Sequence, residues 1–372
     1  MKRKICTVTS TRAEYGIMSR LIEKLYRDSD IEFQLIATGM HLSEKFGHTI
    51  DEITQPIAKT IDIEVEKEPS HSLALTIEKF SKTFKELQPD IIIILGDRYE
   101  IMGVAQAAML NNIPIAHING GDVTQGAIDD AIRHSITKMS HLHFTSCEEY
   151  RKRVIQLGEN PDRVFNVGAL GVENVKTVPL MNKDELEKSL DFKFNKHNLL
   201  VTFHPITLEN NSKEQFIELL NALEDLDETN IIITSPNSDE GNEEIFELIE
   251  KFINEHNNVK FYKSLGMKRY LSTLQFVDAV VGNSSSGIAE APSFGIATVN
   301  IGNRQKGRIQ ASSIINCPPE KESILKAINK AFAEDFSNTK NPYEKENTSD
   351  NIIKILKTYN LNNILEKAFY DL

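Results

Sequence analysis

A stretch of small polar residues in the second half of the chain has the composition of an anion-binding turn. Residues 282–292 read GNSSSGIAEAP and follow the apolar run Phe276–Val281. That order predicts a strand, a tight turn and a helix start, where unpaired N–H groups and the helix dipole attract a phosphate. A capped helix without a ligand is the alternative, since serine is a common N-cap. The candidate binding residues are Ser284, Ser285, Ser286, Gly287 and, one helical turn further on, Glu290.

Two aspartates follow predicted strands in the first half of the chain and are candidates for acid–base chemistry. Asp97 follows a run of four isoleucines and a leucine, with Gly96 between them, so we expect its carboxylate at the sheet edge, partly desolvated. Asp122 follows Gly120 and Gly121, which we expect to let the backbone approach a ligand closely and to aim the carboxylate inward. Capping of the next helix is the alternative for Asp97, and an Asx-turn is the alternative for Asp122.

The helix predicted after Asp122 carries more charged candidates. Its apolar stripe is expected to be Ile128, Ile132, Ile136 and Met139. Asp129 and Arg133, like Asp130 and His134, are four residues apart, so we expect each carboxylate to pair with the cation one turn on. Pairs of this kind are typically surface salt bridges that contribute little to stability.

Other polar side chains follow predicted strands, where ligands of open α/β sheets bind. His204 ends the first strand of the second half and is expected to meet a diphosphate or a sugar hydroxyl, with a core histidine as the alternative. Since the net charge is −12, an anionic ligand would need a local positive site. The candidates for that site, and for substrate binding in general, are Arg12, His41, Arg98, Arg133, His134, Arg304, Lys306 and Arg308.

The composition excludes several classes of protein. An acidic chain lacks the basic surface that nucleic-acid binding requires. The longest apolar run is too short to span a membrane, and the N-terminus leads into a strand rather than a signal peptide, so we expect a cytoplasmic protein. Three cysteines without ligand spacing predict buried thiols. No metal site is predicted, because His141 and His143 have no third ligand and the Asp225–Asp227 pair lies on a helix.

Apolar, β-branched runs alternate with helical patterns throughout the chain, which predicts two doubly wound parallel sheets, each in a Rossmann-like domain. We expect domains at residues 1–175 and 176–345, with Gly168–Asn198 as the linker. Residues 346–372, with an amphipathic helix over Asn351–Ala368, are expected to pack back on the first domain. The predicted strands are Ile5–Thr9, Phe33–Thr38, Ile91–Leu95, Ile113–Ile118, Leu142–Thr145, Leu199–Phe203, Ile231–Thr234, Val259–Tyr262, Phe276–Val281 and Ala297–Ile301.

With these motifs in place, the chain resembles the hydrolysing UDP-N-acetylglucosamine 2-epimerases of bacterial sialic acid synthesis, nearly from end to end. The motifs that carry the resemblance occur in the same order as in that family: TSTRAEYG, TGMH, GDRYE, IRHSITKMSHLH, VIQLGE, FHP, GNSSSGI and NIGNRQKGR. The resemblance implies the GT-B architecture of two Rossmann-like domains with the nucleotide sugar in the cleft. It also implies a homodimer that uses neither a metal nor NAD.

The resemblance further implies roles for single residues. Arg12 and the turn Ser285–Gly287 would hold the diphosphate, His204 would lie at the pyrophosphate, and Glu290 would bind the ribose. Asp97, Asp122 and one of Asp129 or Asp130 would form the acid–base set. Asp122 departs from the family, because relatives commonly have glutamate there, and Asn119 is left outside the set.

The expected reaction converts UDP-N-acetylglucosamine and water to N-acetylmannosamine and UDP. Anti elimination of UDP would give 2-acetamidoglucal, which water and a proton on the other face of C2 then convert to product. One alternative is the same chemistry on UDP-2,4-diacetamido-2,4,6-trideoxyglucose, as in legionaminic acid synthesis. The others are a GT-B glycosyltransferase and a sensor of nucleotide sugars without enzymatic activity, although carboxylates at three strand ends would not help a sensor to bind an anion.

Overall fold

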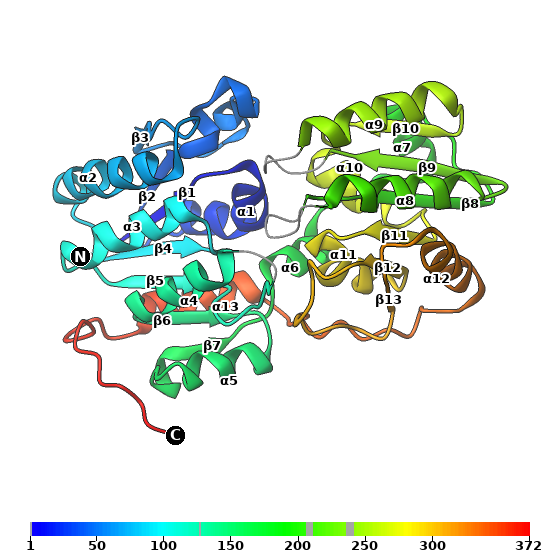
Figure 1. The fold of residues 1–372 in the computed structure, drawn as a ribbon. Coiled ribbons are helices and arrows are strands. Elements are labelled where there is room, and N and C mark those ends of the chain that lie inside the picture. The colour runs from blue at the N-terminus through cyan, green and yellow to red at the C-terminus, as the bar shows by residue number, and fades with distance from the viewer. Residues whose placement is uncertain (1, 126–127, 206–210, 236–241) are drawn as a thin grey trace. The chain divides into compact units, whose positions relative to one another are not determined.

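The computed structural model describes residues 2–125, 128–205, 211–235 and 242–372 (Figure 1). The described residues form two compact units. The first comprises Met1–Asp122, Ile128–Asn174 and Tyr343–Leu372, and the second comprises Val123–Ala127 and Val175–Pro342. The domain limits at residues 175 and 345 stay a prediction, because compactness alone does not show which segments fold independently.

The first unit is built on a seven-stranded parallel sheet in the order β3-β2-β1-β4-β5-β6-β7. The strand order reverses between β1 and β4, which pair directly with each other. In open α/β sheets ligands bind at such a reversal, beyond the carboxyl ends of the strands. The strands are β1 (Arg3–Thr9), β2 (Ile31–Thr38), β3 (Lys59–Ile61), β4 (Ile91–Leu95), β5 (Ile115–Ile118), β6 (Leu142–Thr145) and β7 (Val164–Asn166).

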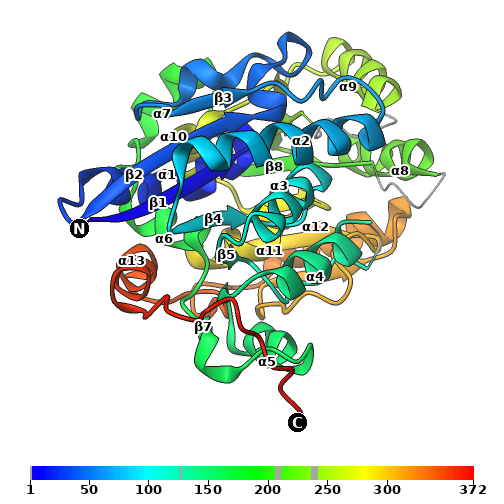
Figure 2. The same ribbon diagram turned by 90° about the vertical axis from the view of Figure 1, so that its left-hand side faces the viewer.

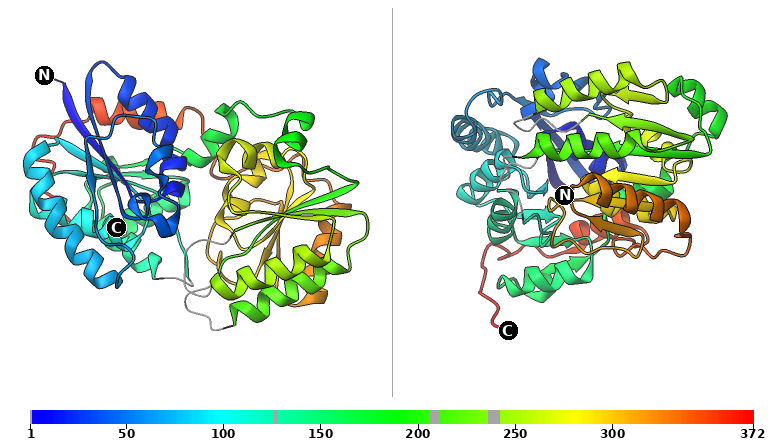
Figure 3. Two further views of the ribbon diagram at one scale, coloured as in Figure 1. Left: turned by 90° about the horizontal axis from the view of Figure 1, so that it is seen from above. Right: turned by 45° about the vertical axis from the view of Figure 1, so that its right-hand side comes forward.

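Helices cover both faces of this sheet. Buried apolar residues of α2, α3 and α4 pack on one face, and those of α1 and α13 pack on the other (Figure 3). All five residues of β4 are buried, as expected for a central parallel strand covered on both faces. The helices of this unit are α1 (Arg12–Arg27), α2 (Pro69–Leu87), α3 (Tyr99–Leu110), α4 (Asp129–Met139), α5 (Glu148–Gln156), α6 (Leu170–Thr177, whose last residues belong to the second unit) and α13 (Thr348–Thr358).

The second unit repeats the design with a six-stranded parallel sheet in the order β10-β9-β8-β11-β12-β13, whose reversal lies between β8 and β11. Its strands are β8 (His197–Thr202), β9 (Thr229–Thr234), β10 (Val259–Tyr262), β11 (Ala279–Gly282), β12 (Ala297–Ile301) and β13 (Ile314–Cys317). Its helices are α7 (Lys183–Leu190), α8 (Ser212–Glu224), α9 (Asn242–Glu255), α10 (Gly266–Thr273), α11 (Ser285–Ala289) and α12 (Lys321–Ala333).

The C-terminal segment differs from its prediction. Helix α13 ends at Thr358, well before the predicted Ala368. The following residues run along the first unit without helical structure (Figure 2). They are held by side chains, because Lys367 Nζ lies 2.7 Å from the buried carboxylate of Glu159 and Arg163 donates to the carbonyl of Ile364 at 2.8 Å. Ile364 beyond Thr358 is therefore buried by packing against the first unit and not by a helix.

All ten predicted strands are present, and the prediction of two parallel α/β sheets in the GT-B fold class is confirmed. Among the described residues the sequence missed three strands, each at the edge of a sheet: β3, β7 and β13. Each is only three or four residues long and partly exposed, so none has the buried apolar run that marks a central strand. All three cysteines are free and buried, as predicted.

Candidate active site

A buried arginine contacts the carboxylates of two of the predicted aspartates in the first unit. Arg133, on α4, is 1% exposed, and its guanidinium pairs with Asp97 after β4. It also donates to Asp130 Oδ1 at 3.2 Å and to the backbone carbonyl of Asp122 at 2.9 Å. Burial alone would lower the pKa of Arg133, but the carboxylates of Asp97 and Asp122 raise it, so the charge is retained. The expectation of a surface salt bridge at Arg133 is wrong, because this side chain is buried and contacts Asp97 after β4 and the backbone of Asp122.

Asp122 is held by a residue that sequence reasoning missed. It is 8% exposed, and its carboxylate accepts a hydrogen bond from the hydroxyl of Ser146, with Oγ 3.2 Å from Oδ1. The preceding Gly121 has φ +83°, and a Cβ there would lie 2.5 Å from the carbonyl oxygen of Tyr150. The glycine is therefore required by the approach of α5, whereas the sequence predicted approach of a ligand.

His117 fixes the turn that presents Asp97, and its role was also missed. It is fully buried on β5, with Nε2 2.8 Å from the carbonyl oxygen of Gly96 and Nδ1 3.2 Å from the hydroxyl of Thr137. Burial lowers its pKa to about 3, although the bond to Gly96 acts in the opposite direction. The ring is therefore neutral and ties the end of β4 to α4. The signal in the sequence was its place at the start of the motif HINGGD, whose last residue is Asp122.

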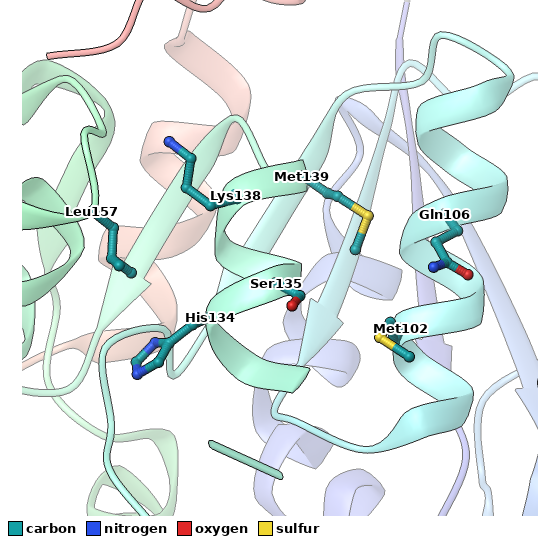
Figure 4. Close-up of a pocket in the computed structure, with 7 residues that line it drawn as sticks. All are labelled: Met102, Gln106, His134, Ser135, Lys138, Met139 and Leu157. Carbon is teal, nitrogen blue, oxygen red and sulfur yellow. The ribbon is translucent and has the colours of Figure 1, made fainter. Parts of the chain in front are cut away.

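The other predicted residues of α4 lie at its outer side. His134 Nε2 is 3.7 Å from Asp130 Oδ2, and burial lowers the pKa of His134 although Asp130 acts in the opposite direction. His134 also lines an open pocket formed by α3, α4 and Leu157 (Figure 4). Asp129 is half-buried at the first position of the helix. Ile128 is 60% exposed, so it does not belong to the predicted buried stripe.

The predicted cations at the ends of β1, β2 and β4 differ in exposure. Arg12 is exposed at the start of α1. Arg98 is partly buried, and its Nε donates to Glu100 Oε1 at 2.6 Å. His41 is fully buried, with its ring nitrogens 3.1 Å from the hydroxyl of Thr9 and 2.8 Å from that of Thr49. Burial lowers the pKa of His41 to about 4, so its ring is neutral and engaged within the protein.

In the second unit, Asn283 joins the ends of β8 and β11. Its side chain accepts from the backbone N–H of His204 at 2.7 Å and donates to the carbonyl of His204 at 2.8 Å. The backbone carbonyl of Asn283 accepts from Arg304 at 3.2 Å and from Gln305 at 2.8 Å. The predicted residues His204 and Arg304 are thus brought together by an asparagine whose role the sequence did not reveal.

The predicted strand, turn and helix over residues 279–289 are confirmed. Ser284 caps α11, accepting from the backbone N–H of Ser286 at 3.4 Å, and the hydroxyl of Ser286 contacts that of Tyr270. Glu290 ends the helix, and burial raises its pKa to about 7 while a bond from Ser286 opposes the shift. Ser285 is the exposed residue of this turn, and Gly287 is buried against Thr298.

Comparison with known proteins shows the family to which the chain belongs. The family model described as UDP-N-acetylglucosamine 2-epimerase matches residues 23–357. The chain belongs to this family. It is 42% identical to a Campylobacter jejuni protein named GDP/UDP-N,N'-diacetylbacillosamine 2-epimerase (hydrolyzing), with 100% of each chain covered. It is 41% identical to the Escherichia coli polysialic acid biosynthesis protein P7, covering 100% of this chain and 98% of the relative.

The fold of this family member agrees with a solved structure as well. The S. aureus MnaA–UDP co-structure matches with a TM-score of 0.82 over 100% of both chains, at 18% identity. Within the part of the chain that the structure describes, no group of three or more His, Cys, Asp or Glu residues is placed to hold a metal ion. No helix among the described residues is long and apolar enough to cross a membrane.

Proposed function

We propose that this epimerase is of the hydrolysing kind and converts a UDP-linked 2-acetamido sugar and water to the free 2-epimer and UDP. The observation that carries the proposal is the grouping of Asp97, Asp130 and the Asp122 backbone around the buried Arg133. Proton transfer at C2 requires carboxyl groups held in a fixed position, and the buried guanidinium holds Asp97 and Asp130. The word "hydrolyzing" in the name of the 42% identical relative supports the same conclusion.

The chemistry needs two proton transfers at C2. Cleavage of the C1–O bond releases UDP, and a carboxylate takes the C2 proton to leave 2-acetamidoglucal. A carboxylic acid then returns a proton to the other face of C2, while water adds its oxygen to C1 and gives up a proton that restores this acid. The proton taken from C2 passes to solvent and restores the carboxylate. We assign these transfers to Asp97 and Asp122, with Asp130 or Asp129 as the third member of the set. Arg133 is a positioning residue in this scheme, because its buried guanidinium is occupied by carboxylates.

The second unit supplies most of the residues that we assign to the nucleotide. Arg12 from the first unit and Ser285–Gly287 are assigned to the diphosphate, His204 to the pyrophosphate region and Glu290 to the ribose. Neutral hydroxyl and backbone N–H donors at a helix start suit the charge of the departing UDP. Assembly as a homodimer stays a prediction, which light scattering of the purified protein would check.

The comparisons leave two sugars as candidates. The name of the C. jejuni relative favours a 2,4-diacetamido-2,4,6-trideoxy sugar, whereas the name of the E. coli relative fits UDP-N-acetylglucosamine as a source of sialic acid. Incubation with each UDP-sugar, and with the GDP-linked diacetamido sugar, followed by product identification, separates them. Release of an epimerised nucleotide sugar instead of a free sugar would refute the hydrolysing reaction.

A further inference from the structure

Two buried glutamates lie beside the candidate active site without a role in the reaction described above. Glu14 is on α1 and is 5% exposed, and Glu100 is on α3 and is fully buried. The helices follow β1 and β4, which are neighbours in the sheet, so both carboxylates lie where the strand order reverses. Arg12 and Asp97 lie in the same two turns.

One serine hydroxyl lies within hydrogen-bonding distance of both carboxylates. Ser10 Oγ is 2.9 Å from Glu14 Oε2 and 3.3 Å from Glu100 Oε1, and the backbone N–H of Ser10 also donates to Glu14, at 2.8 Å. A hydroxyl has one proton, so it can donate to only one of the two. Glu14 Oε1 and Glu100 Oε2 are buried and accept no hydrogen bond from the described residues.

The charges around Glu14 do not balance two ionised carboxylates. Besides burial, the groups that act on its pKa are Glu100 on α3, Arg98 in the turn before α3 and the uncharged Ser10. The Nε of Arg98 donates to Glu100. Burial, and next the charge of Glu100, raise the pKa of Glu14 to about 7, while the bonds from Ser10 and the charge of Arg98 oppose the shift. A proton on Glu14 would reduce the desolvation cost of these buried carboxylate oxygens.

We propose that Glu14 and Glu100 form a carboxylate pair that holds a single proton and positions the turns carrying Arg12 and Asp97. The pair acts through its neighbours: Glu14 fixes the backbone of Ser10, two residues before Arg12, and Glu100 fixes Arg98, next to Asp97. Loss of the proton leaves two buried negative charges beside one guanidinium, and their repulsion opens the turn that presents Arg12. The proposal rests on the assignment of Arg12 to the diphosphate.

The protonation state can be measured directly by infrared spectroscopy. In the wild type, the carbonyl stretch of a protonated carboxylic acid is expected at pH 6 and is expected to disappear as the pH rises through about 7. Glu290 should contribute a similar band, because its pKa is also raised to about 7. Glu14→Gln should therefore remove only the part of the signal that comes from Glu14, whereas the control Glu23→Gln, on the same helix, should keep the whole signal. If the wild type shows no signal that depends on Glu14, the pair does not hold a proton and the proposal is refuted.

Calorimetry of UDP binding from pH 6.5 to 9 tests the positioning role. The affinity of the wild type should fall by up to about tenfold per pH unit above pH 7, the limit for one linked proton. Glu14→Gln, which stays neutral, should show a smaller fall, the remainder coming from Glu290, and an identical pH dependence in both proteins would overturn the proposal. If Glu14→Gln does not fold, Glu100→Gln serves instead, and its acid signal should be lost at lower pH than in the wild type. Neither the infrared signal nor the UDP affinity depends on turnover. Failure of the proposed reaction can therefore be distinguished from failure of this proposal.

Discussion

The side-chain amide of Asn283 forms a reciprocal pair of hydrogen bonds with the backbone of His204, at 2.7 and 2.8 Å. The pair joins the ends of β8 and β11 at the strand-order reversal of the second sheet. A Cβ at the preceding Gly282, which has φ +133°, would lie 2.0 Å from the carbonyl oxygen of Thr202. The turn therefore requires both a glycine and an asparagine, and their combination sets where His204 lies.

Replacing Asn283 with alanine should weaken UDP binding and lower stability. The change removes two hydrogen bonds and leaves backbone groups of His204 without their Asn283 partner, at a cost on the order of 1–3 kcal/mol. Urea unfolding and calorimetry with UDP measure the two effects. Asn230→Ala, which removes one bond to the carbonyl of Lys193, is the control and should leave UDP binding unchanged. Equal UDP affinity in the Asn283 variant and the wild type would contradict the role given to this bridge.

Arg12→Ala and Ser286→Ala should each weaken UDP binding, and the double variant should weaken it further. A charge-assisted hydrogen bond contributes roughly 1.5–3 kcal/mol. Arg12→Ala should leave folding nearly unaffected because Arg12 is exposed, whereas Ser286→Ala also removes the contacts of its hydroxyl with Tyr270 and Glu290. Arg27→Ala, at the other end of α1, is the matched control. Unchanged calorimetric affinity in the double variant would show that these residues do not hold the diphosphate.

Asp97→Asn and Asp122→Asn should lower the rate by about 10²–10⁴, the usual contribution of a positioned acid or base, while UDP binding persists. In deuterium oxide the wild type should form product with deuterium at C2, and it should hydrate supplied 2-acetamidoglucal. Asp51→Asn, an exposed residue, is the control. Retention of the original C2 hydrogen, or near-normal turnover of both variants, would exclude the elimination mechanism.

Ser146→Ala tests the orientation of Asp122. It removes one hydrogen bond to the carboxylate, worth about 0.5–1.5 kcal/mol, so a loss of roughly 2- to 10-fold in kcat is expected with little change in UDP affinity. Ser135→Ala, an exposed serine on α4, is the control. A kcat equal to that of the wild type would show that Ser146 does not orient the carboxylate.

Glu290 should make the stability of the protein depend on pH. Its folded-state pKa of about 7 is raised above the ordinary value of 4.5, so the folded protein holds this proton more tightly than the unfolded chain does. Its contribution to the free energy of unfolding is therefore fully present below about pH 4.5 and is lost as the pH rises through 7. Compared with Glu290→Gln, the wild type should lose on the order of 2 kcal/mol of unfolding free energy between pH 5 and 8. Urea unfolding at several pH values measures this, and parallel curves for both proteins would contradict it.

The strands and the order of the motifs were predictable because they depend on local patterns. A buried parallel strand such as β4 is a continuous apolar run, and the turn after β11 has the composition of a helix start. Short edge strands such as β13 lack these signals. The end of α13 was misplaced because Ile364 is buried by tertiary packing outside the helix. Local apolar periodicity does not distinguish these two causes of burial.

The sequence by itself determined the fold class, the strand ends that carry polar residues and the family. Only the tertiary structure decided which of these residues meet, and it buries Arg133 against Asp97. It also shows that Ser146 contacts Asp122, that His117 holds the turn before Asp97 and that Asn283 holds the backbone of His204. The physical reason is that such contacts join strands and helices far apart in the chain. Their hydrogen bonds depend on distances that packing sets, and spacing along the sequence does not contain those distances.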